Sequence, residues 1–382
     1  AEHALDMAQG RGGDQAAEMT LDGFTFYGGV SHGVEKRSKV RSRLVADQLV
    51  KLIKEADHVV IMGHRMSDLD AIGAAEGVLR ICKICDVPAV IAVRRDATLA
   101  ASLIDALCKA GQKDDFIDPK DALPIISKRT LCIVVDTYQA GLVESKDILE
   151  KCGKVAVIDH HRKGVGYIEN PALVCHEPYS SSASELVTEL LQYVGERDDK
   201  PNRVEAEGLL AGILLDTQDF TLHTGVRTFE AAAALRRYGA ETERVRRLFD
   251  VTMVEYNAKA DLVEKAQMYK NCAISIGGEV APEARVAIAQ AANDLLRIQG
   301  VDASFVAVQV GNGVNVSARR MRAVNVQVIM ESLGGGGHQT MAAAQLKHIT
   351  PQAARSRIQD AIDQYYLSQK KTTPEARPAK GE

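Results

Sequence analysis

The feature that most constrains the fold is a repeated pattern: an apolar run of strand length ends at acidic or imidazole side chains. Such runs lie at residues 59–62, 131–135, 154–158 and 209–215. Stretches with helical spacing separate several of them, and strands that alternate with helices of this length indicate βαβ units and a parallel sheet. Open α/β sheets gather their chemistry at the carboxyl ends of their strands, so the pattern predicts both a fold and the place of its site.

The chain of 382 residues is longer than one compact domain usually is, so two domains are expected. In the first α/β region we expect strands at residues 58–62, 89–93, 131–135 and 155–158, and helices at 42–56, 71–82, 98–110 and 182–194. A mainly helical stretch follows from residue 201 to 268. A second, smaller α/β region should contain strands near 273–276, 305–310 and 314–318, a helix at 285–298 and a final helix from residue 351.

Composition excludes some classes of partner. The net charge is −4, aromatic residues make up 4% and Trp is absent, which argues against a surface for large nucleic acids but leaves room for a local basic pocket. The seven cysteines show no pattern, as expected for reduced thiols in the cytosol. No apolar stretch approaches the ~20 residues of a membrane span, so we expect this part of the protein to be soluble and cytoplasmic.

The side chains that follow the apolar runs suit metal binding. The candidates are His64, Asp68, Asp70, Asp136, Asp159, His160, His161 and Asp216. Carboxylates with some imidazole are ligands of Mn²⁺ and Mg²⁺, and a pair of ions needs a carboxylate that can bridge them. Other roles stay open at this point. Asp68 could cap the helix that follows it, Asp136 could cap a helix or form a turn, and Asp159 with its two histidines could be a hydrogen-bonded polar cluster.

A glycine run near the C-terminal end could bind a phosphate, because glycine lets backbone N–H groups approach an anion without interference from Cβ. It is preceded by a predicted strand that is followed by an arginine, a side chain suited to bidentate phosphate contacts. The candidate substrate-binding residues are Ser317, Arg319, Gly335, Gly336, Gly337 and His338. A flexible turn is the alternative for the glycine run.

These motifs together resemble the DHH/DHHA1 phosphoesterase family. They are Gly63-His64-x-x-x-Asp68-x-Asp70, Asp136, Asp159-His160-His161, Asp216 and the late Gly-Gly-Gly-His at 335–338. The resemblance covers residues 56–346. It implies an α/β fold with a larger DHH domain, built on a mainly parallel sheet flanked by helices, and a smaller α/β DHHA1 domain, with the active site in the cleft between them.

The resemblance also implies two Mn²⁺ ions per active site. One ion would be held by His64, Asp68 and Asp136. The other would be held by Asp70, Asp136, His160 and Asp216, so that Asp136 bridges the pair. The catalytic candidates are His161 and Asp159. His161 would support a metal ligand from outside the coordination sphere or lie near the scissile phosphate, and Asp159 would orient a ligand histidine.

Within that family the chain is most similar to the GdpP-type cyclic di-AMP phosphodiesterases, because residues 4–15 resemble the end of a degenerate GGDEF domain. Such proteins carry transmembrane helices, so the full-length protein is expected to be anchored in the bacterial cell membrane with this part facing the cytoplasm. The expected organisation is a GGDEF-like tail and linker at 1–40, the DHH domain at 41–250, a linker helix at 251–268, the DHHA1 domain at 269–369 and a disordered tail at 370–382.

The implied function is manganese-dependent hydrolysis of cyclic di-AMP to linear 5′-pApA by two-metal activation of water. The alternative within the same fold is a nanoRNase or pAp phosphatase that acts on short oligonucleotides or pApA. A sensor that binds nucleotide without cleaving it would be expected to have lost a metal ligand, and none of the expected positions is substituted. The resemblance also makes a homodimer the expected assembly.

Overall fold

The computed structural model describes residues 15–20, 23–28, 39–161, 166–279, 285–321, 324–337 and 341–372. The chain divides into two compact units, Ala1–Asp250 and Val251–Glu382. Most of the segment that resembles a GGDEF tail, His338 and the last ten residues lie outside the described part. Within the first 40 residues the structure describes an antiparallel hairpin of β1 (Gln15–Thr20) and β2 (Gly23–Gly28), and the start of α2.

The first unit is built on a six-stranded sheet in which every neighbouring pair of strands is parallel, which confirms the predicted architecture. The strand order is β5-β4-β3-β6-β7-β8. The strands are β3 (His58–Met62), β4 (Ala89–Ala92), β5 (Phe116–Ile117), β6 (Thr130–Val135), β7 (Lys154–Asp159) and β8 (Leu173–His176). The sequence reasoning found four of them and missed the short edge strands β5 and β8.

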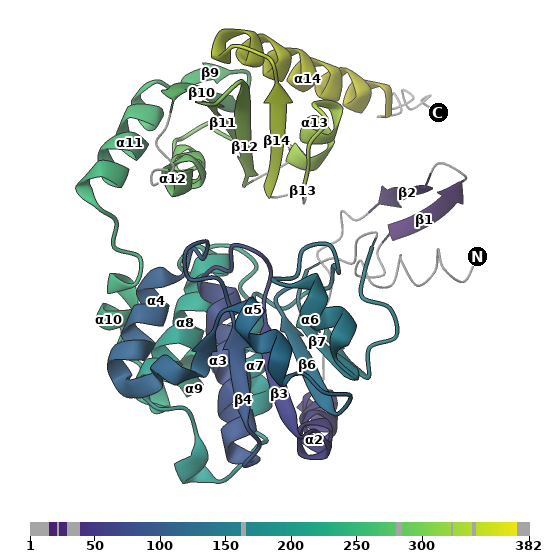
Figure 1. Cartoon of the computed structure of the whole chain (residues 1–382). Helices are drawn as coiled ribbons and strands as arrows, with labels where there is room; N and C mark the ends of the chain where they lie inside the picture. The colour runs from purple at the N-terminus through teal and green to yellow at the C-terminus, as the bar shows by residue number, and fades with distance from the viewer. Residues whose placement is uncertain are drawn as a thin grey trace, which may run out of the picture. The chain divides into compact units, whose positions relative to one another are not determined.

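Helices cover both faces of this sheet (Figure 1), and alternate side chains of each strand point to opposite faces. Val59 and Ile61 of β3 pack toward α3, α7 and α8, whereas Val60 and Met62 pack toward α5 and α6. The helices are α2 (Lys39–Glu55), α3 (Leu69–Ile84), α4 (Ala101–Leu107), α5 (Pro119–Ala122), α6 (Lys146–Lys151), α7 (Ala183–Leu191), α8 (Arg203–Thr217), α9 (Val226–Arg237) and α10 (Thr242–Arg247). Helix α4 begins three residues later than expected and continues as a π-helical turn, Cys108–Gln112.

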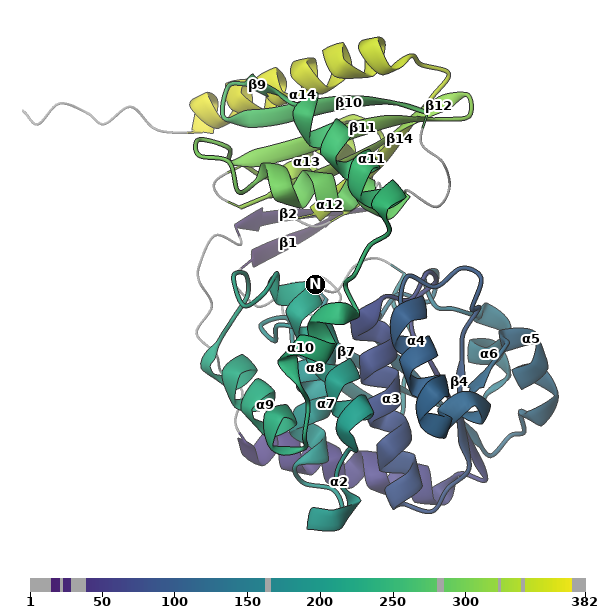
Figure 2. The same ribbon diagram turned by 90° about the vertical axis from the view of Figure 1, so that its left-hand side faces the viewer.

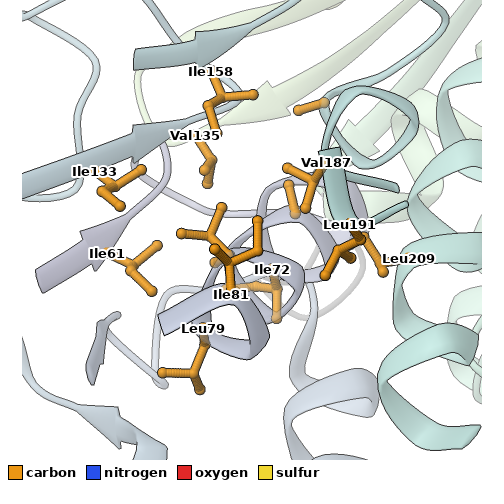
Figure 3. Packing of buried hydrophobic residues seen from close by; sticks show 14 of the residues in the cluster. Ile61, Ile72, Leu79, Ile81, Ile133, Val135, Ile158, Val187, Leu191 and Leu209 are labelled. Carbon is orange, nitrogen blue, oxygen red and sulfur yellow. The ribbon is translucent and has the colours of Figure 1, made fainter. Parts of the chain in front are cut away.

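The core on the first face joins the central strands to α3, α7 and α8. Ile61, Ile133 and Ile158, from three neighbouring strands, meet Ile72 of α3 and Val187 of α7 there (Figure 3). All five side chains are buried. This continuous apolar layer fixes the positions of the strand ends, where the polar side chains follow.

Helices α3 and α8 approach each other closely because glycines face the contact. A Cβ atom added to Gly73 of α3 would lie 2.5 Å from the carbonyl oxygen of Gly208 on α8. A Cβ added to Gly212, one turn further along α8, would lie 2.8 Å from the Cα of Asp70. The close helix contact therefore positions a candidate metal ligand.

The second unit is a smaller α/β unit with a six-stranded mixed sheet of order β13-β14-β12-β11-β10-β9, in which only β10 and β11 pair in parallel. Helices α13 and α14 cover one face and α12 the other (Figure 2). The elements are α11 (Met253–Glu264), β9 (Gln267–Tyr269), β10 (Cys272–Glu279), α12 (Arg285–Leu295), β11 (Ala303–Val310), β12 (Gly313–Arg320), α13 (Val326–Ser332), β13 (Gly336–Gly337), β14 (Met341–Lys347) and α14 (Pro351–Thr372).

Two expected boundaries are corrected in this unit. The linker expected to be helical over 251–268 is helical only as far as Glu264, because Gln267 begins an edge strand that pairs with β10. Helix α14 reaches Thr372, so the first three residues of the tail expected to be disordered are helical. Among the described residues, no helix combines the length and the apolar character that crossing a membrane requires.

Candidate metal centre

The candidate ligands of the first unit meet at the carboxyl edge of its sheet. Strands β3, β6 and β7 are adjacent and parallel, so the residues that follow them emerge side by side. Directly after β6 the chain turns at Asp136, whose φ of 58° lies in the left-handed region. Asp tolerates this conformation better than most residues, and such residues are frequent at functional sites. Its N–H donates to Ile158 O at 2.9 Å, which ties the turn to the neighbouring strand.

His64 lies in the loop that follows β3, with one ring nitrogen engaged by the backbone. Its Nδ1 donates to Arg65 O at 2.9 Å, which leaves Nε2 as the nitrogen for a metal ion. Nε2 is 3.4 Å from Asp136 Oδ2 and 3.8 Å from Asp68 Oδ1. Burial would lower the pKa of His64, but the two carboxylates raise it to about 12. The two carboxylates thus strongly favour a positive charge at the position of the His64 ring.

Asp68 has the capping role that the sequence left open, and it also faces the cluster. It is the N-cap of α3, and its Oδ1 accepts from the N–H groups of Asp70 and Ala71 at 3.0 and 3.1 Å. The same carboxylate forms a group of possible metal ligands with His64 and Asp136. Capping and ligation are therefore compatible at this position.

Asp70 is fully buried and is held by the first turn of α7. Its Oδ2 accepts from Ala183 N–H at 2.7 Å and its Oδ1 from Ser184 N–H at 2.8 Å. A helix N-terminus offers such unsatisfied N–H groups and favours negative charge. Burial, with the nearby charges of Asp136 and Asp216, nevertheless raises the pKa of Asp70 well above its usual range. A cation beside Asp70 would relieve that cost.

Asp136 lies between the two halves of the cluster. Its Oδ2 is 3.4 Å from His64 Nε2, and its Oδ1 is 3.4 Å from His160 Nε2. Burial would raise the pKa of Asp136, but the two histidines hold it well below its usual range. Both Asp136 Oδ1 and His160 Nε2 are buried, and among the described residues neither atom makes a hydrogen bond with suitable angles. Because buried polar atoms normally have partners, these two fit a metal ion that accepts their lone pairs.

His160 and Asp216 form the other side of the cluster. His160 follows β7, and its Nε2 lies 3.0 Å from Asp216 Oδ2 and 3.9 Å from Asp70 Oδ2. Asp216 comes from the last turn of α8, so a helix rather than a strand supplies this ligand. The described residues thus contain three overlapping groups whose possible ligand atoms lie within 4.8 Å of one another: His64, Asp68 and Asp136; Asp70, His160 and Asp216; and Asp136, His160 and His161.

Asp159 supports His161 rather than His160. The Oδ1 of this fully buried carboxylate accepts from both His161 N–H, at 3.2 Å, and His161 Nδ1, at 2.8 Å. Sequence reasoning missed a further residue, His176, at the end of β8. Its Nε2 donates to His161 O at 2.5 Å, and its ring lies 5.5 Å from that of Tyr138. A single histidine at the end of a short edge strand carries no signal in the sequence that would have singled it out.

The candidate substrate-binding residues of the second unit lie on or next to two strands, β12 and β13, that both pair with β14. Ser317 and Arg319 belong to β12; Ser317 pairs with Ala343 of β14, which pairs with Gly336 of β13. Arg319 Nη1 donates to Ser317 Oγ at 3.1 Å and to Ala318 O at 2.9 Å, while its buried Nε has no hydrogen-bond partner in the part of the chain that the structure describes. Burial lowers the pKa of Arg319 to about 10. Of the predicted substrate-binding residues, only His338 lies outside the described part.

The fold and the centre define an α/β protein with a parallel-sheet unit that carries a potential metal site, followed by a smaller mixed-sheet unit. The family models agree: residues 58–213 match the N-terminal domain of the DHH family, and residues 281–367 match the DHHA1 domain. The chain therefore belongs to the DHH/DHHA1 family.

The chain is 45% identical over 372 residues to the cyclic-di-AMP phosphodiesterase GdpP of Geobacillus thermodenitrificans, an alignment that covers 96% of this chain and 56% of the relative. It is 42% identical over 376 residues to GdpP of Bacillus subtilis, with 96% and 57% covered. The chain thus spans just over half the length of these relatives. An exopolyphosphatase-related protein from Bacteroides fragilis has the same fold, with a TM-score of 0.73 at 19% identity and 86% and 98% of the two chains covered.

Proposed function

We propose that the chain is the catalytic part of a phosphodiesterase that hydrolyses cyclic di-AMP to linear 5′-pApA with two Mn²⁺ ions. The observation that carries the two-ion proposal is the position of Asp136, whose two oxygens each lie 3.4 Å from a different imidazole nitrogen. A carboxylate placed in this way can bridge two ions. The substrate is supported by the two GdpP relatives, which are cyclic-di-AMP phosphodiesterases.

The proposed ligands are the six predicted from the sequence. His64, Asp68 and Asp136 would hold one ion, and Asp70, Asp136, His160 and Asp216 the other. When bound, such a pair of ions supplies activation of a water molecule and neutralisation of charge on the phosphoryl oxygens.

The chain's own groups set the geometry of this centre. The two N–H groups of α7 fix the orientation of the Asp70 carboxylate. Arg65 O accepts from His64 Nδ1 and so directs Nε2 into the cluster. Asp159 orients the ring of His161, which we propose contacts the scissile phosphate.

We also propose that Arg319, Ser317 and the glycine segment 335–337 bind a phosphate of the substrate, with the Gly335 N–H itself donating to Met330 O at 2.8 Å. The support is the unsatisfied, buried Nε of Arg319, since a buried guanidinium that has no carboxylate partner among the described residues favours an anion. Four features stay predictions from the family resemblance: an active site in a cleft between the units, a homodimer, an upstream GGDEF domain and a membrane anchor in the longer protein.

The test is a hydrolysis assay with the purified chain and Mn²⁺, in which cyclic di-AMP, cyclic di-GMP, pApA, pAp and a short oligonucleotide are compared. We expect cyclic di-AMP to be converted to 5′-pApA, and His160→Ala to abolish turnover. His58→Ala, at the opposite end of the sheet from the centre, is the matched control and should keep wild-type turnover. Cleavage of pAp or oligonucleotides with cyclic di-AMP untouched would favour the nanoRNase alternative instead.

A further inference from the structure

The loop that carries His64 and Asp68 is held by backbone hydrogen bonds to the loop that follows β6. Glu144 N–H donates to Gly63 O at 2.9 Å, and Arg65 N–H donates to Leu142 O at 2.8 Å. Between these two bonds, His64 forms an isolated antiparallel bridge with Val143. The β6 loop therefore supports one side of the metal-binding loop along its backbone.

The loop that follows β4 holds the other end of the same segment. Ser67 O accepts two hydrogen bonds, from Leu99 N–H at 2.9 Å and from Thr98 Oγ1 at 2.7 Å. Thr98 N–H in turn donates to Arg94 O at 3.1 Å, so this support begins at Arg94. In the sheet, β3 lies between β4 and β6. The metal-binding loop is thus held from both neighbouring strands.

One ion pair joins the two supporting loops to each other. Arg94 Nε lies 2.5 Å from Glu144 Oε1. The Glu144 side chain is 1% exposed and that of Arg94 is 40% exposed. A buried carboxylate needs a partner, and Glu144 raises the pKa of Arg94 in return. Glu144 therefore both contacts Gly63 through its backbone and anchors the β4 loop through its side chain.

We propose that the Arg94–Glu144 ion pair is a positioning device for the metal centre: it clamps the β4 and β6 loops on the loop of residues 63–68 and so sets the distance of His64 and Asp68 from Asp136. Neither Arg94 nor Glu144 is a ligand in this proposal. It deepens the proposed function and rests on it for the metal. The positioning itself is a property of the chain alone and can be measured without any ion.

A general contribution to stability is the rival explanation, and a matched pair separates the two. Arg227 and Glu189 form an ion pair with side chains 11% and 7% exposed, between α9 and α7. Its arginine is more buried than Arg94, and the hydrogen bonds described for its two side chains join them to each other and to Ser42 of α2. Glu144→Gln and Glu189→Gln both remove the charge of a carboxylate that is paired with arginine. A difference between the two variants would therefore come from where the ion pair lies in the fold.

The first experiment measures amide hydrogen exchange in the metal-free chain at Arg65, Leu99 and Glu144, the three backbone N–H groups that make the cross-loop bonds. We expect exchange at these amides to be at least about tenfold faster in Glu144→Gln and in Arg94→Met, with β7 and α8 unchanged. The double variant should be no faster than the faster single variant, because each residue acts through the other. In Glu189→Gln the three amides should exchange as in the wild type.

The second experiment titrates Mn²⁺ and follows the spin-coupled pair by electron paramagnetic resonance. Glu144→Gln should weaken the binding of one ion about tenfold and that of the other less than twofold. Exchange at the three amides within twofold of wild type, or an equal acceleration throughout the first unit, would overturn the clamp. A wild-type chain that binds no pair of ions would refute the proposed function, while the exchange result would still decide the positioning.

Discussion

A methyl group added at Gly212 should damage the metal centre through packing alone. In the Gly212→Ala variant the new Cβ would lie 2.7 Å from Asp70 Oδ1 and 2.8 Å from Asp70 Cα, and it would also clash with Ser184 Oγ. The Asp70 backbone belongs to α3, so the clash cannot be relieved by rotating a side chain. Either α8 moves away from α3, or Asp70 leaves its place at the α7 N-terminus.

Gly208→Ala is the matched control, one turn earlier on the same helix. Its Cβ would lie 3.0 Å from Leu103 Cδ1, the end of a side chain that can shift by a few tenths of an ångström. Replacing glycine by alanine inside a helix gains about 1 kcal/mol at either position. Overpacking against fixed atoms costs about 1–3 kcal/mol. Gly212→Ala should therefore be less stable than Gly208→Ala by about 2 kcal/mol.

Urea denaturation gives the free energies of unfolding, and Mn²⁺ titration gives the effect on the centre. Gly208→Ala should unfold within about 1 kcal/mol of the wild type and bind Mn²⁺ normally. Gly212→Ala should be destabilised and should bind more weakly the ion that Asp70 is proposed to hold. If both variants were equally stable and bound Mn²⁺ like the wild type, the claim that α8 packs closely against Asp70 at Gly212 would be refuted.

Three further outcomes follow from single residues. Burial raises the pKa of Glu76 to about 8, so between about pH 5 and 8 the folded chain keeps a proton on Glu76 that the unfolded chain has lost. This group alone should lower the free energy of unfolding by up to about 1.4 kcal/mol per pH unit across that range, and Glu76→Gln should remove that part of the slope in urea titrations at several pH values. Asp68→Asn should stay within about 0.5 kcal/mol of wild-type stability, because asparagine also caps helices, but it should bind Mn²⁺ more weakly. Asp68→Ala should bind Mn²⁺ more weakly and also lose about 1 kcal/mol of stability. If Asp68→Asn bound Mn²⁺ with wild-type affinity, Asp68 would be a helix cap and not a ligand. His176→Leu removes the donor to His161 O, so it should lower the stability by about 1 kcal/mol and reduce turnover. His176→Gln keeps a donor and should recover most of the stability and most of the turnover, as measured by thermal unfolding and hydrolysis assays.

The central strands could be predicted from the sequence because their signal is local. β3, β6 and β7 are uninterrupted apolar runs that lie within a residue or two of the expected positions. β5 has two residues, and β8 has four, of which one is exposed and one half-buried. Such short segments become strands only because a neighbouring strand edge is available, and that information is not local.

The set of candidate ligands could also be predicted, since each follows an apolar run or belongs to one recognisable motif. Their supports could not. Asp70 is held by N–H groups more than a hundred residues later in the chain, and Arg94 meets Glu144 across an intervening strand. Contacts of this kind depend on the order of the strands in the sheet. The sequence offered capping and ligation as alternatives for Asp68, whereas in the structure the same carboxylate caps α3 and faces the cluster.

The central claim is that two divalent ions share Asp136. The most direct measurement is an anomalous difference map from crystals grown with Mn²⁺. We predict two peaks about 3.5–4 Å apart, one beside His64 and Asp68 and the other beside His160, Asp70 and Asp216, with one oxygen of Asp136 facing each peak. A single peak, or a pair of peaks that Asp136 does not contact, would contradict the account.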